Sequence, residues 1–472
     1  MQRLHLGKLL AGPSLALLVG AAGHASGLPA LAAWTAAITA LCATWWILEP
    51  IHISATSIIP FAAFPLLGVL DEKQVATSYG HPLVMLLMGG FMLSTAMSAS
   101  GAHRRVAIWL VKLIGGGRRR LVLGFMLASA LCSMWISNTA TVLMLLPVAL
   151  AVIDAEPEPD GLAAPLLLGI AWAASVGGMA TPIGTPPNII LLGVYQESTG
   201  VHVSFLDWMR IGLPVVVLLL PVAWAILALP MRDGPVAPIP AQGPWRRHER
   251  RVLALFVLTA LAWTFRTAPF GGWAGALALK GVEDATVAFS ALALLFVLPS
   301  GDGPRQSGAR EGSDRLLCWE EARQVPWGLL LLFGGGIAIA KAFDSSGLGA
   351  IMGEALAGIA ALPVLLMTLA LCLGVTFLTE VTSNTATTAL LMPVLAAAAL
   401  AAGLEPAILM VPAALSASCA FMLPVATAPN AIIYGTDRVP IRFMARRGLA
   451  LNVLGAVGIA GVCSLLLRGG LG

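Results

Sequence analysis

One five-residue phrase occurs twice in this chain, and each copy interrupts a long apolar segment. Ser-Asn-Thr-Ala-Thr begins at Ser137 and again at Ser383, and a proline follows ten residues after each serine, at Pro147 and Pro393. Polar side chains at the depth of a bilayer are costly unless they pair with one another or bind a ligand. A duplicated polar break therefore predicts a ligand site assembled from two equivalent halves.

The composition indicates an all-α integral membrane protein. Of the 472 residues, 58% are hydrophobic and only 11% are charged, whereas soluble domains carry roughly 25% charged residues. The formal net charge of +4 is small, and we expect no nucleic-acid partner. The six cysteines are scattered without a CxxC pair, which favours a packing role over a metal or disulfide role. No organic cofactor is expected.

Apolar runs long enough to cross a bilayer predict about eleven spans. They are expected at 9–24, 28–48, 51–70, 82–100, 163–195, 211–230, 252–268, 284–299, 327–346, 405–437 and 448–468. The two segments that carry Ser-Asn-Thr, 120–154 and 362–400, are predicted to be re-entrant hairpins. Residues 1–27 resemble a signal peptide, but a first membrane helix left in place agrees better with this topology.

The two copies belong to a longer internal repeat with an offset of 246 residues. At that offset Gly89-Gly90 matches Gly335-Gly336, and Ser133 matches Thr379. Arginine groups at 104–120, 246–251 and 446–447 should be cytoplasmic. This places the N-terminus inside and the C-terminus outside, with the two hairpins entering from opposite sides. The halves are then inverted repeats related by an axis in the membrane plane.

Each half contains a second polar break, at Thr181–Asn188 and at Leu423–Asn430. Prolines inside these segments stop the helix and free backbone groups, so four polar breaks can meet near one depth. Helix N-termini favour an anion there, and neutral Ser, Thr and Asn oxygens suit a hard cation. Because neither the tips nor the breaks contain Lys or Arg, an anion bound at this depth needs co-bound cations for neutralisation.

The motifs FLTEVTSNTATTALLMP (377–393) and FMLPVATAPNAIIYG (421–435) resemble those of the divalent anion:sodium symporter family. The similarity extends from about Gly89 to Asn430. It implies an elevator-type homodimer that couples sodium entry to uptake of a dicarboxylate, citrate or sulfate. It also implies scaffold helices at 1–100 and 211–346, transport regions at 101–210 and 347–445, and a last helix at 446–472.

The resemblance also implies roles for individual residues. The substrate would be bound by Ser137, Asn138, Thr139, Thr185, Ser383, Asn384, Thr385 and Thr427. One sodium ion would be held by Ser133, Ser137, Asn138 and Gly184, and a second by Thr379, Thr382, Asn384 and Ala426. The chain departs from the family pattern at Ala428, where proline is frequent, and this could alter one wall of the site.

Two other transport functions remain open from the residues alone. A sodium-independent anion exchanger or an oxyanion exporter could share this fold, although an obligate exchanger would more naturally keep a fixed basic residue in the site. An intramembrane enzyme would need a nucleophile with a base, or paired acids. Neither tip has a histidine, and the repeat equivalent of Glu380 is Met134, so we expect no enzyme. We interpret Glu380 as a structural hydrogen-bonding partner, with ion coupling as the alternative.

The anion itself and the sodium stoichiometry are not determined by these patterns. The arginine-biased, alanine- and glycine-rich composition favours a bacterial inner membrane as the location.

Overall fold

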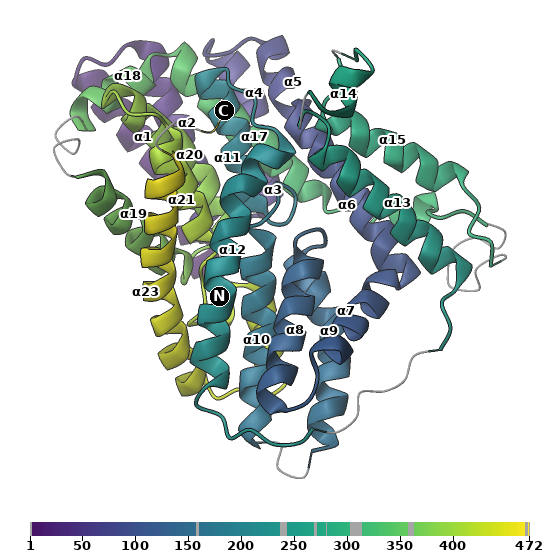
Figure 1. The fold of residues 1–472 in the computed structure, drawn as a ribbon. Coiled ribbons are helices and arrows are strands. Elements are labelled where there is room, and N and C mark those ends of the chain that lie inside the picture. Colours follow the sequence, from purple (N-terminus) through teal and green to yellow (C-terminus); the bar gives the residue numbers. More distant parts are fainter. Residues whose placement is uncertain are drawn as a thin grey trace.

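The computed structural model describes residues 2–156, 160–236, 243–268, 271–279, 281–302, 314–356, 363–467 and 471, and regular structure within them is helical (Figure 1). The first half contains α1 (Gln2–Ala25), α2 (Ala30–Leu48), α3 (Ile53–Thr56), α4 (Ile59–Leu66), α5 (Glu72–Tyr79), α6 (Pro82–Ser100), α7 (Ala102–Ile114), α8 (Arg118–Ser133), α9 (Asn138–Asp154), α10 (Asp160–Gly178), α11 (Pro186–Thr199) and α12 (Phe205–Ala228). The second half contains α13 (Arg247–Thr264), α14 (Gly272–Ala276), α15 (Asp284–Val297), α16 (Trp319–Ala322), α17 (Trp327–Ser345), α18 (Leu348–Leu356), α19 (Val364–Thr379), α20 (Asn384–Ala401), α21 (Ala407–Ala417), the short 3-10 turn η2 (Pro424–Ala426), α22 (Ala428–Tyr434) and α23 (Ile441–Leu466).

Eight helices of the described chain are long and apolar enough to cross a membrane. Other apolar helices of the described chain are only 10–17 residues long, among them α9, α15 and α19. The prediction of an all-helical membrane protein is confirmed, whereas the structure does not confirm the expected number of eleven spans.

The segment expected to span the membrane at 51–70 is not one helix. It divides into α3 and α4 around Ser57, and Pro60 stands at the start of α4. The bend is held in place because the Trp46 indole N–H donates to Ser57 Oγ at 3.1 Å and the Tyr79 hydroxyl donates to the Ser57 carbonyl. These two distant donors stabilise a break that apolarity alone did not indicate.

The internal repeat is visible in the helix boundaries. Adding 246 to the bounds of α8 gives those of α19, and α9 and α20 begin at the equivalent asparagines Asn138 and Asn384. In Figure 1, α8 and α9 lie in the lower half of the view and α18 and α20 in the upper half. The 16 residues of α8 and of α19 span only about 24 Å, less than the ~30 Å hydrocarbon core. This short length agrees with the prediction of hairpins, which stays a prediction.

A glycine lets α10 pack closely against α8 of the first hairpin. In α10, 94% of residues 161–178 are buried, so this helix lies in the interior of the molecule. A Cβ added at Gly177 of α10 would lie 2.4 Å from the Ala130 Cα of α8. Small residues commonly permit such backbone approach between membrane helices.

We therefore expect Gly177→Ala to force α8 and α10 apart, with a loss of about 3 kcal/mol of stability from overpacking against backbone atoms. The midpoint of thermal unfolding in detergent should fall measurably. Gly374→Ala on α19 is the matched control, because an added Cβ there meets no atom within 4 Å. An unchanged midpoint for Gly177→Ala would contradict the close contact.

Candidate functional site

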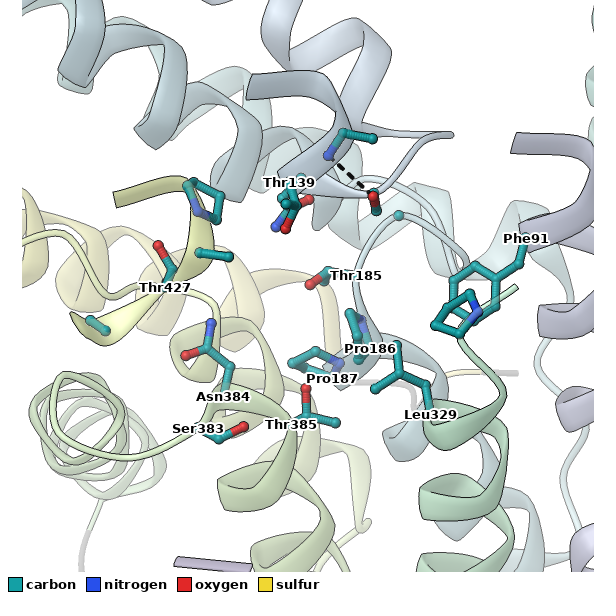
Figure 2. A pocket seen from close by; sticks show the side chains of 18 of the residues that line it. Phe91, Thr139, Thr185, Pro186, Pro187, Leu329, Ser383, Asn384, Thr385 and Thr427 are labelled. Atoms are coloured by element: carbon teal, nitrogen blue, oxygen red, sulfur yellow. Dashed lines mark hydrogen bonds between the residues drawn. The ribbon is translucent and has the colours of Figure 1, made fainter. Parts of the chain in front are cut away.

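The four polar breaks come together around one cavity of about 890 Å³. Its lining includes residues 137–140 and 381–385 at the two hairpin tips and residues 183–187 and 425–429 at the two broken helices. Figure 2 shows Thr185, Asn384 and Thr427 arranged around the same space, with Thr139 nearby. Segments separated by almost three hundred residues thus contribute to a single pocket.

Nearly all of the site residues expected from sequence line this cavity. They are Ser137, Asn138, Thr139, Gly184, Thr185, Thr382, Ser383, Asn384, Thr385, Ala426 and Thr427. The two exceptions, Ser133 and Thr379, are buried at the ends of α8 and α19 and are not part of the lining. They act on the cavity indirectly, because each forms a hydrogen bond to a tip asparagine that lines it.

The two tips have the same internal geometry. Ser133 Oγ donates to Asn138 Oδ1 at 2.6 Å, and Thr379 Oγ1 donates to Asn384 Oδ1 at 2.6 Å. Both hydroxyls are buried with their residues, so the amide of each asparagine is held in one orientation. Each following helix is capped by the preceding serine, because Ser137 Oγ accepts from Ala140 N and Ser383 Oγ accepts from Ala386 N.

Equivalent asparagines hold the two broken helices together by hydrogen bonds to backbone carbonyls. Asn188 Nδ2 donates to the carbonyls of Gly178 and Thr181 at 3.0 and 2.7 Å. Asn430 Nδ2 donates to the carbonyls of Ala420 and Leu423 at 2.9 and 3.1 Å. Both asparagines are fully buried. Each side chain satisfies carbonyls that the interrupted helix leaves unpaired, which an apolar interior requires.

Glu380 pairs the backbone N–H groups of the second break, whereas Asn430 pairs its carbonyls. Its carboxylate accepts hydrogen bonds from the backbone N–H groups of residues 421, 422 and 423 at 2.7 to 3.0 Å, and a fourth from Asn452 Nδ2 at 2.7 Å. The residue is only 3% exposed and does not line the cavity. The interpretation of Glu380 as a structural hydrogen-bonding partner is confirmed.

Aromatic rings hold the first tip against neighbouring helices. The Trp135 ring stacks on Phe205 of α12 with centroids 5.7 Å apart, and Phe205 stacks on Trp263 of α13 at 4.9 Å. Phe256 of α13 meets Trp135 edge-on at 5.4 Å. Apolar rings thus link the tip to both helices.

The structure adds lining residues that the motifs did not indicate. Lys8 of α1, Glu49 after α2 and Ser94 and Thr95 of α6 face the cavity with Phe91 and Leu329. These residues are isolated in sequence and belong to no repeated pattern, so only tertiary contacts could identify them. The four polar segments themselves contain no charged side chain, and among the residues the structure describes no group of His, Cys, Asp and Glu could hold a metal ion.

Comparisons with known proteins agree with this arrangement. Residues 43–411 match the family model described as a citrate transporter. The chain is 38% identical to the sodium-dependent dicarboxylate transporter SdcS of Staphylococcus aureus over 470 residues, which covers 95% of this chain and 88% of SdcS.

Two solved transporters have a similar fold. The YdaH transporter of Alcanivorax borkumensis superposes with a TM-score of 0.62 at 17% identity, covering 84% of this chain and 88% of that one. MtrF of Neisseria gonorrhoeae gives a TM-score of 0.61 at 13% identity, covering 86% and 84%. At these identities the similarity concerns the fold.

The fold and its central polar cavity define an integral membrane transporter and not an enzyme. The chain belongs to the divalent anion:sodium symporter family, as the motifs around the second tip and second break had indicated.

Replacing Glu380 should destabilise the second break. In Glu380→Gln an amide N–H₂ would face backbone donors, and hydrogen bonds to a charged group are worth about 1.5–3 kcal/mol each, so we expect a loss of about 3 kcal/mol and a smaller loss for Asn452→Ala. Thermal unfolding of the purified protein measures both. Glu72→Gln, at an exposed position in the first turn of α5, serves as the control. If Glu380→Gln unfolded at the same temperature as this control, the hydrogen bonds to the Glu380 carboxylate would not contribute to stability.

Proposed function

We propose that this protein is a secondary active transporter that couples inward sodium movement to uptake of a small divalent anion such as a C4-dicarboxylate, citrate or sulfate. One observation carries the proposal: both tips and both broken helices line a single cavity, and these four segments supply neutral oxygens and helix N-termini but no charge. The relationship to SdcS, whose name describes a sodium-dependent dicarboxylate transporter, supports the same conclusion.

The substrate is proposed to bind where the two helices after the tips begin. The amides of Asn138 and Asn384 and the hydroxyls of Thr139 and Thr385 line the cavity there, and Ser137 and Ser383 stand at the N-caps. Thr185 and Thr427 add hydroxyls from the broken helices. Helix N-termini favour anions through free N–H groups and the helix dipole, which supports placing carboxylate or sulfate oxygens at this point.

The sodium ions are proposed to bind beside each tip. The first would contact Ser133, Ser137, Asn138 and Gly184, and the second Thr379, Thr382, Asn384 and Ala426. The hydrogen-bonded pairs Ser133–Asn138 and Thr379–Asn384 place hard neutral oxygens at both positions. Nearby, Asn188 Oδ1 and Asn430 Oδ1 are buried without a hydrogen-bond partner among the described residues, so each region retains acceptor oxygens suited to a hard cation.

An elevator movement is proposed because the cavity has two kinds of wall. One wall comes from the hairpins and broken helices of the transport regions 101–210 and 347–445. The other includes Lys8, Glu49 and Phe91 from the expected scaffold 1–100. Displacement of the first set of helices along the second would carry the ligands across the membrane. We further propose a homodimer in a bacterial inner membrane, with the N-terminus cytoplasmic, the C-terminus outside and the two halves as inverted repeats.

Sodium-independent anion exchange is the second candidate, and Lys8 is the observation that favours it. A fixed cation at the cavity could neutralise part of the anion charge without sodium. Glu49 lines the same cavity, however, and offsets this charge, so the sodium-coupled reading has the stronger support.

Uptake into proteoliposomes separates these two functions. We expect labelled succinate, citrate or sulfate to accumulate when an inward sodium gradient is present, and to remain near background when choline replaces sodium. Protein-free liposomes provide the control. Equal uptake in sodium and choline would overturn the coupling to sodium.

The tip asparagines should be required for uptake. Asn138→Ala and Asn384→Ala each remove an amide proposed to contact both the anion and sodium, so uptake should fall at least about tenfold, equivalent to more than about 1.4 kcal/mol of binding. Gel filtration would check that the variants remain folded. Gln196→Ala on α11, an amide outside the cavity, is the matched control. Wild-type uptake by both variants would remove these residues from the site.

A further inference from the structure

A second large cavity, of about 770 Å³, lies at the ends of α8, α10, α12 and α23. It shares no lining residue with the substrate cavity. Its charged lining consists of four arginines, Arg118, Arg232, Arg438 and Arg447, against one aspartate, Asp437. The substrate cavity has no arginine in its lining, so the two cavities differ in the chemistry that they can recognise.

Neighbouring carboxylates engage only part of this positive charge. Arg118 pairs with Glu156 at 3.0 Å and Arg438 with Asp154 at 2.7 Å. Asp233, next to Arg232, accepts hydrogen bonds from the backbone N–H groups of Arg119 and Gly234 at 3.3 and 3.1 Å.

Two arginines therefore remain available to a ligand. Within the described ranges, neither Arg232 nor Arg447 makes an ion pair with a carboxylate. Arg447 is instead held over the Phe443 ring, 5.5 Å from its centroid. A guanidinium over an aromatic face keeps the N–H donors in its own plane, so they stay free to bind an anion.

The rest of the wall is largely apolar, and exposed apolar side chains lie beside it. Ala163, Ala164, Pro165, Leu227, Pro230 and Phe443 line the cavity. Beside it, Leu229 is 52% exposed at the end of α12, and Ile441 and Leu449 are 41% and 44% exposed on α23.

The position along these helices is that of a membrane boundary. The apolar stretch of α12 ends just before Arg232, and that of α23 begins just after Arg447. The arginines therefore lie at the level where lipid headgroups meet hydrocarbon.

We propose that this cavity is a binding site for the phosphate headgroup of an anionic phospholipid. Arg232 and Arg447 contact the phosphate, Phe443 and the prolines cover the glycerol region, and the acyl chains lie along the exposed apolar faces of α12 and α23. Basic pockets between membrane helices suit anionic headgroups in this way. The apolar surface that continues from the pocket favours a lipid over a free phosphate ion, which has no acyl chain to bury.

Native mass spectrometry of the full-length protein tests this site. The protein would be released from nanodiscs that contain equal amounts of phosphatidylglycerol and phosphatidylcholine. We expect wild type to retain phosphatidylglycerol in preference to phosphatidylcholine. In Arg232→Gln/Arg447→Gln the retention should fall about tenfold or more, because each arginine near an anionic surface contributes about a factor of five. The charge-preserving Arg232→Lys/Arg447→Lys should retain most of the preference.

Arg442→Gln/Arg446→Gln is the matched control, because these two exposed arginines belong to the same helix but do not line the cavity. It should bind lipid like wild type. Equal loss in both double-glutamine variants would show a general surface-charge effect and overturn the proposal. So would equal retention of the two lipids by wild type, or displacement of the lipid by millimolar inorganic phosphate. Gel filtration checks that each variant is folded.

Discussion

Hydrogen bonds to backbone groups at the two broken helices are the interactions on which the rest of this structure depends. Each break interrupts a helix beside the cavity, and the asparagines that pair its carbonyls are fully buried, where an unpaired carbonyl or N–H costs several kcal/mol. Asn188 and Asn430 satisfy carbonyls with their side-chain N–H groups, and Glu380 accepts from three consecutive backbone N–H groups. These side chains make irregular backbone tolerable, and the cavity exists because the backbone there is irregular.

The hairpin tips reuse one arrangement at two places. A hydroxyl at the end of the first helix orients an asparagine at the start of the second, as in the pairs Ser133–Asn138 and Thr379–Asn384. Under the proposed function each asparagine contacts both the anion and a sodium ion. Binding of one ligand then orders the groups that receive the other, and the co-bound cations neutralise an anion that the four polar segments cannot neutralise alone.

The two halves have equivalent tips, but different contacts fix these regions in place: hydrogen bonds in the second half and aromatic packing in the first. The second break is clamped by Glu380 and Asn452, whereas the repeat equivalent of Glu380 is Met134. The first tip is instead fixed by Trp135, which packs among aromatic rings of α12 and α13. The offset between equivalent residues also changes, from 246 at the tips to 242 between Thr185 and Thr427.

The sequence by itself determined the helical membrane class, the repeated tips, the second breaks and the family, because these are local patterns of apolar runs, prolines and polar phrases. It also located most lining residues of the cavity, since they lie within those phrases. Only the tertiary structure showed that 51–70 divides into two helices around Ser57 and which donors bind the Glu380 carboxylate. It also showed that Lys8 and Glu49 line the cavity and that four arginines line the second pocket. The physical reason is separation along the chain: Glu380 meets Asn452 across 72 residues, and Arg118 shares a pocket with Arg447. No local periodicity records such contacts, because they arise from how the helices pack.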